Sequence, residues 1–244
     1  MYLSRVFLNP RRQGTALFIG SPQRLHAAVL AAFPQDPPTG ETDGPRVLWR
    51  LDTDDHRRPV LWVSSPGKPS FEHITDDYGW PSSDMPFETR SMQALLDRLS
   101  PGQEYVFRTT VNPVKAQAGK PDAEGRRGRG KIVPLVGAAA RVEWFVDHAP
   151  KWGFEVPLST VQPPEGGPAW AAETRDSLRL RFHRKGSSKA VVLQTVTLEG
   201  KLQVTDADLF RRSLIRGIGR ARGYGCGLLS LASATAPAAV PSRT

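Results

Sequence analysis

Five glycines and two arginines share eleven positions near the end of the chain, in the stretch GIGRARGYGCG. We call residues 217–227 the glycine-rich segment; its glycines are Gly217, Gly219, Gly223, Gly225 and Gly227, and its arginines are Arg220 and Arg222. Exposed backbone N–H groups beside guanidinium groups bind phosphate oxygens well, which makes this segment a candidate phosphate site. The alternative is a tight connection whose residues require positive φ angles.

Side chains that can move a proton near neutral pH are few. The histidines are His26, His56, His73, His148 and His183, and no two of them have the spacing of metal ligands. The lone cysteine, Cys226, can form neither a cysteine cluster nor an intramolecular disulfide. We therefore expect no metal and no cofactor. His26 is the candidate acid–base group, one helical turn after Gln23. A structural or simply exposed histidine is the alternative.

Basic residues are concentrated in three segments of the C-terminal half, although the whole chain carries a net charge of only +9. Residues 115–131, 175–189 and 211–222 together carry +14, so the rest of the chain carries −5. A basic surface confined to a few places on an otherwise acidic body suits an extended polyanion, and nucleic acid is the leading candidate. Each segment taken alone is also compatible with an ordinary solvated surface.

Two similar strand starts, SRVFLNP (4–10) and FRTTVNP (107–113), predict two copies of one unit. After the first start, Ser21 and Pro22 begin a helix, and strands are expected at 46–52, 58–65 and 87–92. This order is the β-α-β-β-α-β pattern of a ferredoxin-like domain.

The second start is followed by a predicted helix at 135–153 and strands at 154–161, 177–183, 190–204 and 227–232. Thr205 and Asp208 are expected to form a capping box for a helix before the glycine-rich segment. The fold class is therefore α+β, with two tandem ferredoxin-like domains at 1–95 and 96–232 and a disordered tail at 233–244. Residues 34–46 and 115–131 are expected to be mobile loops.

The stretches MYLSRVFLNP, LWRLD, FRTTVNPVKA and GIGRARGYGCGLLSLA together resemble the CasE family, in the right order over most of the chain. These are RAMP-type, RRM-like endoribonucleases of type I-E CRISPR systems. The resemblance implies binding of the CRISPR repeat stem-loop in precursor crRNA and cleavage at the 3′ base of the stem. It also implies that the protein stays on the mature crRNA with the other subunits of the surveillance complex.

The resemblance assigns the catalytic role to His26, because the family's histidine lies on the first helix. It implies a metal-independent reaction in which a 2′-hydroxyl attacks the phosphate and leaves a 2′,3′-cyclic phosphate. Some members carry a tyrosine three residues before this histidine and a lysine five residues after it, where this chain has Gln23 and Ala31. Gln23 and Arg24 are the candidate assisting residues. The amide of Gln23 cannot act as an acid or base but can orient the phosphate by hydrogen bonding, and the guanidinium group of Arg24 can stabilise its charge.

The basic segments supply the predicted RNA contacts, because A-form RNA is read mainly through shape and backbone. The RNA-binding candidates are Lys115, Lys120, Arg126, Arg127, Arg129, Lys131, Arg179, Arg181, Arg184, Lys185, Arg220 and Arg222. Two alternatives remain: a crRNA-binding subunit of the same complex that has lost cleavage, and a metal-dependent nuclease. Without a signal peptide or a membrane-spanning stretch, the sequence predicts a cytoplasmic protein with no membrane partner.

Overall fold

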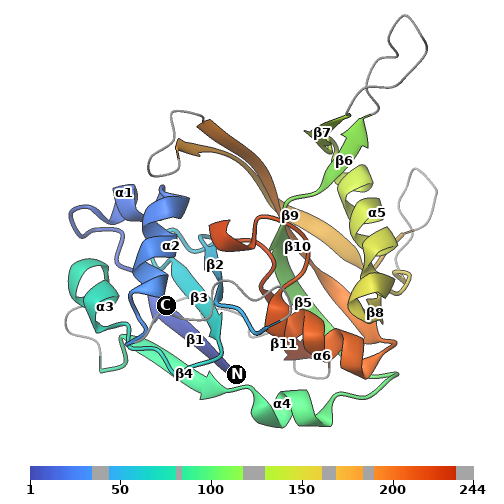
Figure 1. The fold of residues 1–244 in the computed structure, drawn as a ribbon, viewed down its shortest axis with the longest axis horizontal. Helices are drawn as coiled ribbons and strands as arrows, with labels where there is room; N and C mark the ends of the chain where they lie inside the picture. The colour runs from blue at the N-terminus through green and yellow to red at the C-terminus, as the bar shows by residue number, and fades with distance from the viewer. Residues whose placement is uncertain (35–43, 81–83, 118–129, 161–168, 184–189, 235–244) are drawn as a thin grey trace, which may run out of the picture.

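The structure, a computed structural model, describes residues 1–34, 44–80, 84–117, 130–160, 169–183 and 190–234. Its elements form two halves, each built on an antiparallel sheet (Figure 1). None of the helices in these residues combines the length and apolar character that crossing a membrane requires.

The first half is a four-stranded sheet in the order β2-β3-β1-β4. Its strands are β1 (Tyr2–Phe7), β2 (Leu48–Asp52), β3 (Val60–Ser65) and β4 (Phe87–Ser91), and its helices are α1 (Thr15–Ile19), α2 (Pro22–Leu30) and α3 (Glu72–Tyr78). The apolar stripe of α2 is buried through Leu25 and Val29 against Val6 and Leu61 of the sheet. One face of the sheet thus carries the helix on which His26 lies.

The second half repeats this strand order as β11-β5-β10, with β8 and β9 both paired to β10. Its strands are β5 (Glu104–Val111), β8 (Phe154–Glu155), β9 (Ala172–His183), β10 (Ala190–Val204) and β11 (Leu229–Ser233). The helices are α5 (Ala138–His148) and α6 (Ala207–Arg216), with short 3-10 turns η1 (Ala149–Trp152) and η2 (Arg222–Tyr224). Helix α4 (Gln93–Arg98) connects the halves. The predicted tandem ferredoxin-like fold is confirmed.

Two features extend the second half beyond this common plan. Strands β9 and β10 continue past the sheet as a long two-stranded ribbon, and β6 (Val114–Gln117) pairs with β7 (Lys131–Pro134) in a separate hairpin (Figure 1). Lys115 and Lys131 therefore lie on strands, which corrects the expectation that the whole of 115–131 is a loop. Residues 118–129 between them, like most of the predicted loop 34–46, lie outside the described residues.

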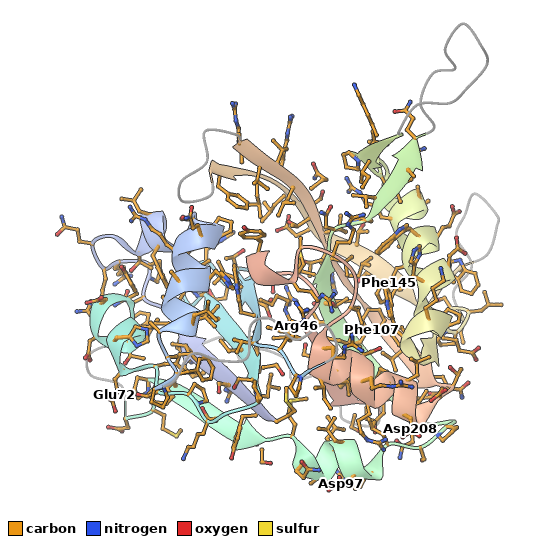
Figure 2. All side chains as sticks on the ribbon, viewed as in Figure 1. Arg46, Glu72, Asp97, Phe107, Phe145 and Asp208 are labelled. Carbon is orange, nitrogen blue, oxygen red and sulfur yellow. The ribbon has the colours of Figure 1, made fainter. Side chains whose placement is uncertain are left out.

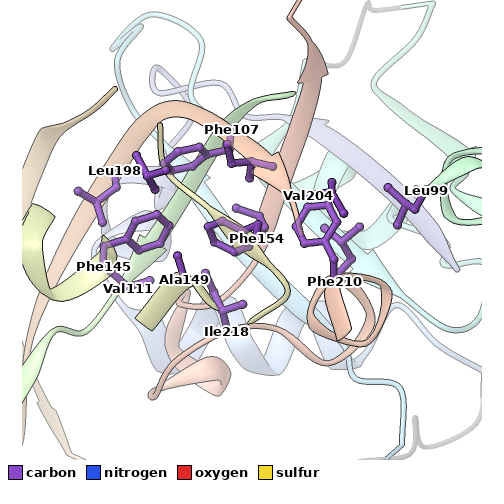
Figure 3. Packing of buried hydrophobic residues seen from close by; sticks show 14 of the residues in the cluster. Leu99, Phe107, Val111, Phe145, Ala149, Phe154, Leu198, Val204, Phe210 and Ile218 are labelled. Atoms are coloured by element: carbon purple, nitrogen blue, oxygen red, sulfur yellow. The ribbon is translucent and has the colours of Figure 1, made fainter. Parts of the chain in front are cut away.

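Aromatic rings fill the core of the second half, between its sheet and its helices (Figure 3). The ring centroid of Phe145 on α5 lies 5.2 Å from that of Phe107 on β5 and 5.8 Å from that of Phe154 on β8. Phe154 in turn contacts Phe210 of α6 edge-on, at 5.6 Å. All four side chains are at most 1% exposed, so this cluster fixes both helices to the sheet.

Helix ends follow local sequence signals, with one correction. Ser21 caps α2 as predicted, since its Oγ accepts a hydrogen bond from the backbone N–H of Arg24 at 3.4 Å. The capping box predicted for α6 from Thr205 and Asp208 is wrong. The cap is Asp206, whose Oδ1 accepts from the backbone N–H of Leu209 at 2.8 Å. The aspartate side chain, one residue later in the sequence than Thr205, is the better acceptor at a helix N-terminus.

Strand β11 ends at Ser233, one residue into the predicted tail, and residues 235–244 lie outside the described part of the chain. The predicted strand at 154–161 is shorter, because β8 covers only Phe154–Glu155. The predicted helix at 135–153 is α5 followed by η1, and Gly153 ends it with a φ of +84°, as expected for a glycine stop.

Candidate nucleic-acid interface and active site

The glycine-rich segment joins α6 to β11 in the second half and lies against β2 of the first half. A Cβ atom added at Gly217 would lie 2.7 Å from the side chain of Leu48, and one added at Gly225 would lie 2.8 Å from the ring of Trp49. The segment therefore needs glycine where its backbone approaches β2 closely. Cys226, between two of these glycines, is fully buried, and burial raises the pKa of its thiol to about 12.

Backbone geometry adds a second reason for the glycines. Gly217, Gly219, Gly225 and Gly227 have φ angles between +68° and +87°, as the tight-connection interpretation requires. Ala221 has a φ of +59°, which a side chain rarely tolerates, and this strain is of the kind found at functional sites. Gly223 has no positive φ; it instead lies against His26 of the first half.

His26 lies on α2, half-buried, at the junction of the two halves. A Cβ atom at Gly223 would be 3.6 Å from its Cε1 and 3.7 Å from its Nε2, so this edge of the ring faces the glycine-rich segment. Its Nδ1 is buried and has no hydrogen-bond partner among the described residues. Burial lowers the pKa of His26 below its ordinary value, and the neutral imidazole is therefore the dominant form at pH 7.

Tyr224, at the end of η2, is the aromatic neighbour of His26. Their ring centroids are 6.2 Å apart with the planes inclined at 52°, and on its other side Tyr224 contacts Phe182 of β9 at 4.7 Å. The backbone N–H of Tyr224 donates to the carbonyl of Ala221 at 2.8 Å, which fixes the turn. Residues from α2, from β9 and from the glycine-rich segment thus meet at one place.

A basic groove of about 750 Å³ opens beside Tyr224, between the β6–β7 hairpin and the edge of β10. Its lining includes Asn112, Ile132, Arg179, Val192, Arg220 and Tyr224. Both arginines are exposed, and the lining contains no carboxylate. A second, much smaller cavity of about 90 Å³ lies between the halves, and Tyr224 lines it together with Trp49 and Leu180. Tyr224 therefore lines both the groove and the cavity between the halves.

The other predicted site residues are placed as follows. Arg181 is exposed on β9, and Lys115 and Lys131 are exposed on the β6–β7 hairpin. Arg222 is turned inward, where its Nη1 donates to the carbonyl oxygens of Arg216 and Gly217 at 3.0 and 3.4 Å, so it caps the C-terminal end of α6. Candidates outside the described residues are Lys120, Arg126, Arg127, Arg129, Arg184 and Lys185.

The two candidate assisting residues differ in position. Gln23 precedes His26 by three residues and lies on the same face of α2, where it is half-buried. Arg24 is exposed, and two positions before His26 its side chain faces a different direction around the helix. Sequence reasoning did not bring Tyr224 or Phe182 next to His26. No local pattern connects them to His26, because only the docking of the two halves brings them together.

Potential metal ligands do not gather anywhere in the described residues: no three side chains of histidine, cysteine, aspartate or glutamate lie close enough together to hold an ion. A set of ion pairs lies instead at the junction. Arg108 of β5 contacts Asp52, Asp54 and Glu199 at 3.5, 2.5 and 2.9 Å. These acidic groups already have basic partners, which suits a structural role.

Arg50 of β2 joins the halves directly and is only 2% exposed. Its guanidinium group forms a bidentate pair with Asp52, at 2.7 and 3.0 Å. Its Nη1 donates across the junction to the carbonyl of Arg108 and to Oγ of Ser230, both at 2.8 Å. Nearby, the backbone N–H of Arg46 donates to the carbonyl of Ile215, and Figure 2 shows Arg46 at the centre of the molecule.

Comparison with known proteins agrees with this architecture. A family model described as "CRISPR associated protein" matches residues 1–233. The chain belongs to this CRISPR-associated family. A relative from Thermus thermophilus, named CRISPR-associated endoribonuclease Cse3, is 28% identical over 95% of this chain and all of its own length. The CRISPR system Cascade subunit CasE of Escherichia coli is 29% identical over 62% of this chain and 71% of its own length. The predicted CasE-type membership is confirmed.

A solved structure shows the same fold. Thermus thermophilus Cse3, bound to an RNA that represents a pre-cleavage complex, superposes with a TM-score of 0.69 and 25% identity, over 95% of this chain and 98% of the other. The predicted class, an endoribonuclease, agrees with the names of these CasE-type relatives.

Proposed function

We propose that this protein is an endoribonuclease that processes CRISPR precursor RNA, with His26 as its central acid–base residue. The observation that carries the proposal is the contact of His26 with the glycine-rich segment, which also lines a basic groove through Arg220 and Tyr224. The Cse3 relatives support the substrate class, since they are named endoribonucleases and one was solved with a pre-cleavage RNA. The CasE relative, a Cascade subunit, supports a place in a multisubunit surveillance complex.

The reaction begins when the 2′-hydroxyl next to the scissile phosphate attacks the phosphorus atom. Because the neutral form of His26 dominates at pH 7, its imidazole accepts the 2′-hydroxyl proton as a general base. The products are a 2′,3′-cyclic phosphate and a free 5′-hydroxyl, and the cut lies at the 3′ base of the repeat stem. This chemistry uses only side chains and the RNA's own hydroxyl, so no metal is needed. The protein then stays on the mature crRNA.

The groove is the surface on which the repeat stem lies. Arg179 and Arg220 place two exposed cations in a groove without carboxylates, which suits the phosphate backbone of an RNA duplex. Such contacts position RNA with little base recognition, while the shape of the stem-loop supplies specificity. Lys115 and Lys131 are exposed on the face of the β6–β7 hairpin opposite the groove-lining Ile132, so they form a separate positive surface.

The decisive experiment is cleavage of a 5′-end-labelled CRISPR repeat hairpin in excess EDTA by the wild type and by His26→Ala. We expect the wild type to cut once, at the base of the stem, and the variant to be slower by about 10²–10⁴-fold, the usual contribution of a general base. RNA affinity, measured by filter binding, should be equal for the two proteins.

Each other result contradicts part of the proposal. Binding without cleavage by the wild type favours an RNA-holding subunit that has lost activity. This is the main rival, because Gln23 and Ala31 stand where some members of the family carry a tyrosine and a lysine. Cleavage abolished by EDTA and restored by Mg²⁺ favours a metal-dependent nuclease. Equal cleavage by both proteins means that His26 is not the catalytic group.

A further inference from the structure

The proposed reaction needs two proton transfers, and His26 accounts for one. The 2′-oxygen must lose a proton while the departing 5′-oxygen must gain one, and a single neutral imidazole cannot do both in the same step. On its own helix His26 has no partner suited to this task. Gln23 can donate a hydrogen bond but cannot give up a proton, and Arg24 faces a different side of α2.

The opposite wall of the site carries a group that can give up a proton. The phenol ring of Tyr224 is centred 6.2 Å from the imidazole ring of His26, and the neighbouring residue Gly223 lies close to Nε2 of that imidazole. Tyr224 also lines the basic groove beside Arg220 and Arg179. A phosphate held by those arginines would therefore lie beside the ring of Tyr224, whose centroid is 6.2 Å from that of His26.

Several contacts hold Tyr224 in this place. Phe182 packs against its ring at 4.7 Å, and its backbone N–H closes the turn that begins at Ala221, a residue with a strained φ of +59°. The next residue, Gly225, fits against Trp49 only because it has no side chain. Backbone strain and close packing within one turn are typical of a backbone that fixes a functional side chain, here that of Tyr224.

We infer that Tyr224 is the second catalytic residue of the cleavage reaction, the proton donor to the leaving 5′-oxygen. The inference rests on the proposed function. In the step, the bond from 2′-oxygen to phosphorus forms and the bond from phosphorus to 5′-oxygen breaks. The 2′-hydroxyl proton passes to His26 Nε2 and the phenolic proton of Tyr224 passes to the 5′-oxygen. Solvent then removes the proton from the imidazolium and returns one to the phenolate.

The two catalytic groups therefore come from different halves of the molecule. His26 belongs to a helix of the first ferredoxin-like half and Tyr224 to the last connection of the second. This division gives the glycine-rich segment a role beyond binding phosphate, because the segment positions the acid, Tyr224, beside the base, His26. It also explains how a chain with Gln23 one turn before its histidine can still cleave RNA.

The test is a leaving-group substitution that removes the need for the acid. A repeat hairpin is made with sulfur in place of the bridging 5′-oxygen at the cut site, because a thiolate departs without protonation whereas an alkoxide does not. Single-turnover cleavage of the oxygen and sulfur substrates is compared for the wild type, Tyr224→Phe, His26→Ala and Tyr105→Phe. Tyr105 of β5 is the matched control, since it does not line the groove and its hydroxyl donates to Oε1 of Gln103 at 3.0 Å.

We expect Tyr224→Phe to cut the oxygen substrate about 10²-fold more slowly than the wild type and the sulfur substrate at nearly the wild-type rate. His26→Ala should be slow on both substrates, and Tyr105→Phe should behave as the wild type. Wild-type rates for Tyr224→Phe on the oxygen substrate overturn the inference. So does an equal loss on both substrates, which assigns Tyr224 to positioning only. Failure of the wild type to cut either substrate contradicts the proposed function itself and is distinguishable from both.

Discussion

The two halves of the molecule share one strand order but differ in what they add to it. In the first, the sheet has strands of five or six residues and is covered by short helices, with His26 on the second of them. In the second, β9 and β10 reach 12 and 15 residues and continue beyond the sheet, and an extra hairpin follows β5. The first half thus holds the proposed base, and the second provides an extended surface.

This difference suggests how one fold, used twice, divides a task. A helix packed on a sheet through Leu25 and Val29 keeps an imidazole in a fixed position, which acid–base chemistry requires. Ribbons and connections outside the sheet can instead follow the shape of an RNA duplex. The glycine-rich segment, with Tyr224, joins the two roles because it belongs to the second half and lies on β2 of the first.

The largest expected effect comes from breaking the link between the halves. Arg50→Met removes a buried cation that bonds to both halves, and Asp52 retains only the longer contact to Arg108. We expect the free energy of unfolding to fall by about 3 kcal/mol, the lower range for breaking a buried pair. Urea unfolding measures this. Arg90→Met, at an 85% exposed side chain, is the control and should change stability by less than about 0.5 kcal/mol.

A smaller effect is expected from forcing the glycine-rich segment away from β2. Gly225→Ala combines a φ of +80° with a Cβ atom 2.8 Å from the ring of Trp49. The expected loss is about 2 kcal/mol of unfolding free energy, together with reduced cleavage because Tyr224 is displaced. Thermal unfolding and single-turnover cleavage are the measurements. Gly67→Ala, where a Cβ atom meets only Phe33 at 4.0 Å, should leave both unchanged.

The pH dependence of cleavage tests the role of the first half. Burial lowers the pKa of His26 in the folded protein, so the base stays neutral until the pH falls below its ordinary value of about 6.5. We expect the single-turnover rate to be flat between that pH and about pH 8, and to fall about tenfold per unit once the pH is below the lowered pKa. If the rate already decreases while the pH is lowered from 8 to 7, His26 is not a neutral base with a lowered pKa.

The same shift predicts a small change in stability. Between the lowered folded pKa and the unfolded value near 6.5, the unfolded chain binds more protons at His26 than the folded protein does. Stability attributable to this residue is therefore complete above pH 6.5 and is lost as the pH falls through that window. Comparing urea unfolding of His26→Gln with the wild type at pH 7.5 and pH 5 isolates the contribution, which should vanish in the variant.

The smallest predicted effect concerns the second half. Arg179→Ala should weaken RNA binding and lower the slope of log affinity against log salt by about 1, or about fourfold between 50 and 200 mM salt. Cleavage of bound RNA should continue at the wild-type rate. Arg175→Ala on the same strand is the control, because Arg175 is already paired with Glu173 and Glu199 at 3.2 and 2.7 Å. Equal slopes for both variants mean that the groove does not bind the phosphate backbone.

The fold was largely predictable because its signals are local. Ser21 and Pro22 identify the start of α2, and alternating apolar residues identify the strands of both sheets. The short helices α1 and α4 have five and six residues, too few for a helical period to be evident in the sequence. The cap of α6 was assigned to Thr205 because several adjacent polar residues can accept the same hydrogen bond.

The site was less predictable, since its parts come from distant segments. His26 was found through the helix that carries it, and the glycine-rich segment through its composition. The inward position of Arg222 and the closeness of Tyr224 to His26 depend on how α6, β2 and η2 pack together. Packing between distant segments leaves no local pattern in the sequence. Residues that meet only at the junction therefore cannot be connected before the fold is known.

Cys226 offers a built-in sensor of the contact on which this arrangement depends. The chain has a single cysteine, and its thiol is buried in the glycine-rich segment with a pKa raised to about 12, so it is doubly protected from alkylating reagents. Modification can proceed only while the glycine-rich segment opens and exposes the thiol. The rate of alkylation of the unaltered protein therefore measures how often this segment opens, and slower alkylation in the presence of RNA would show that substrate holds it closed.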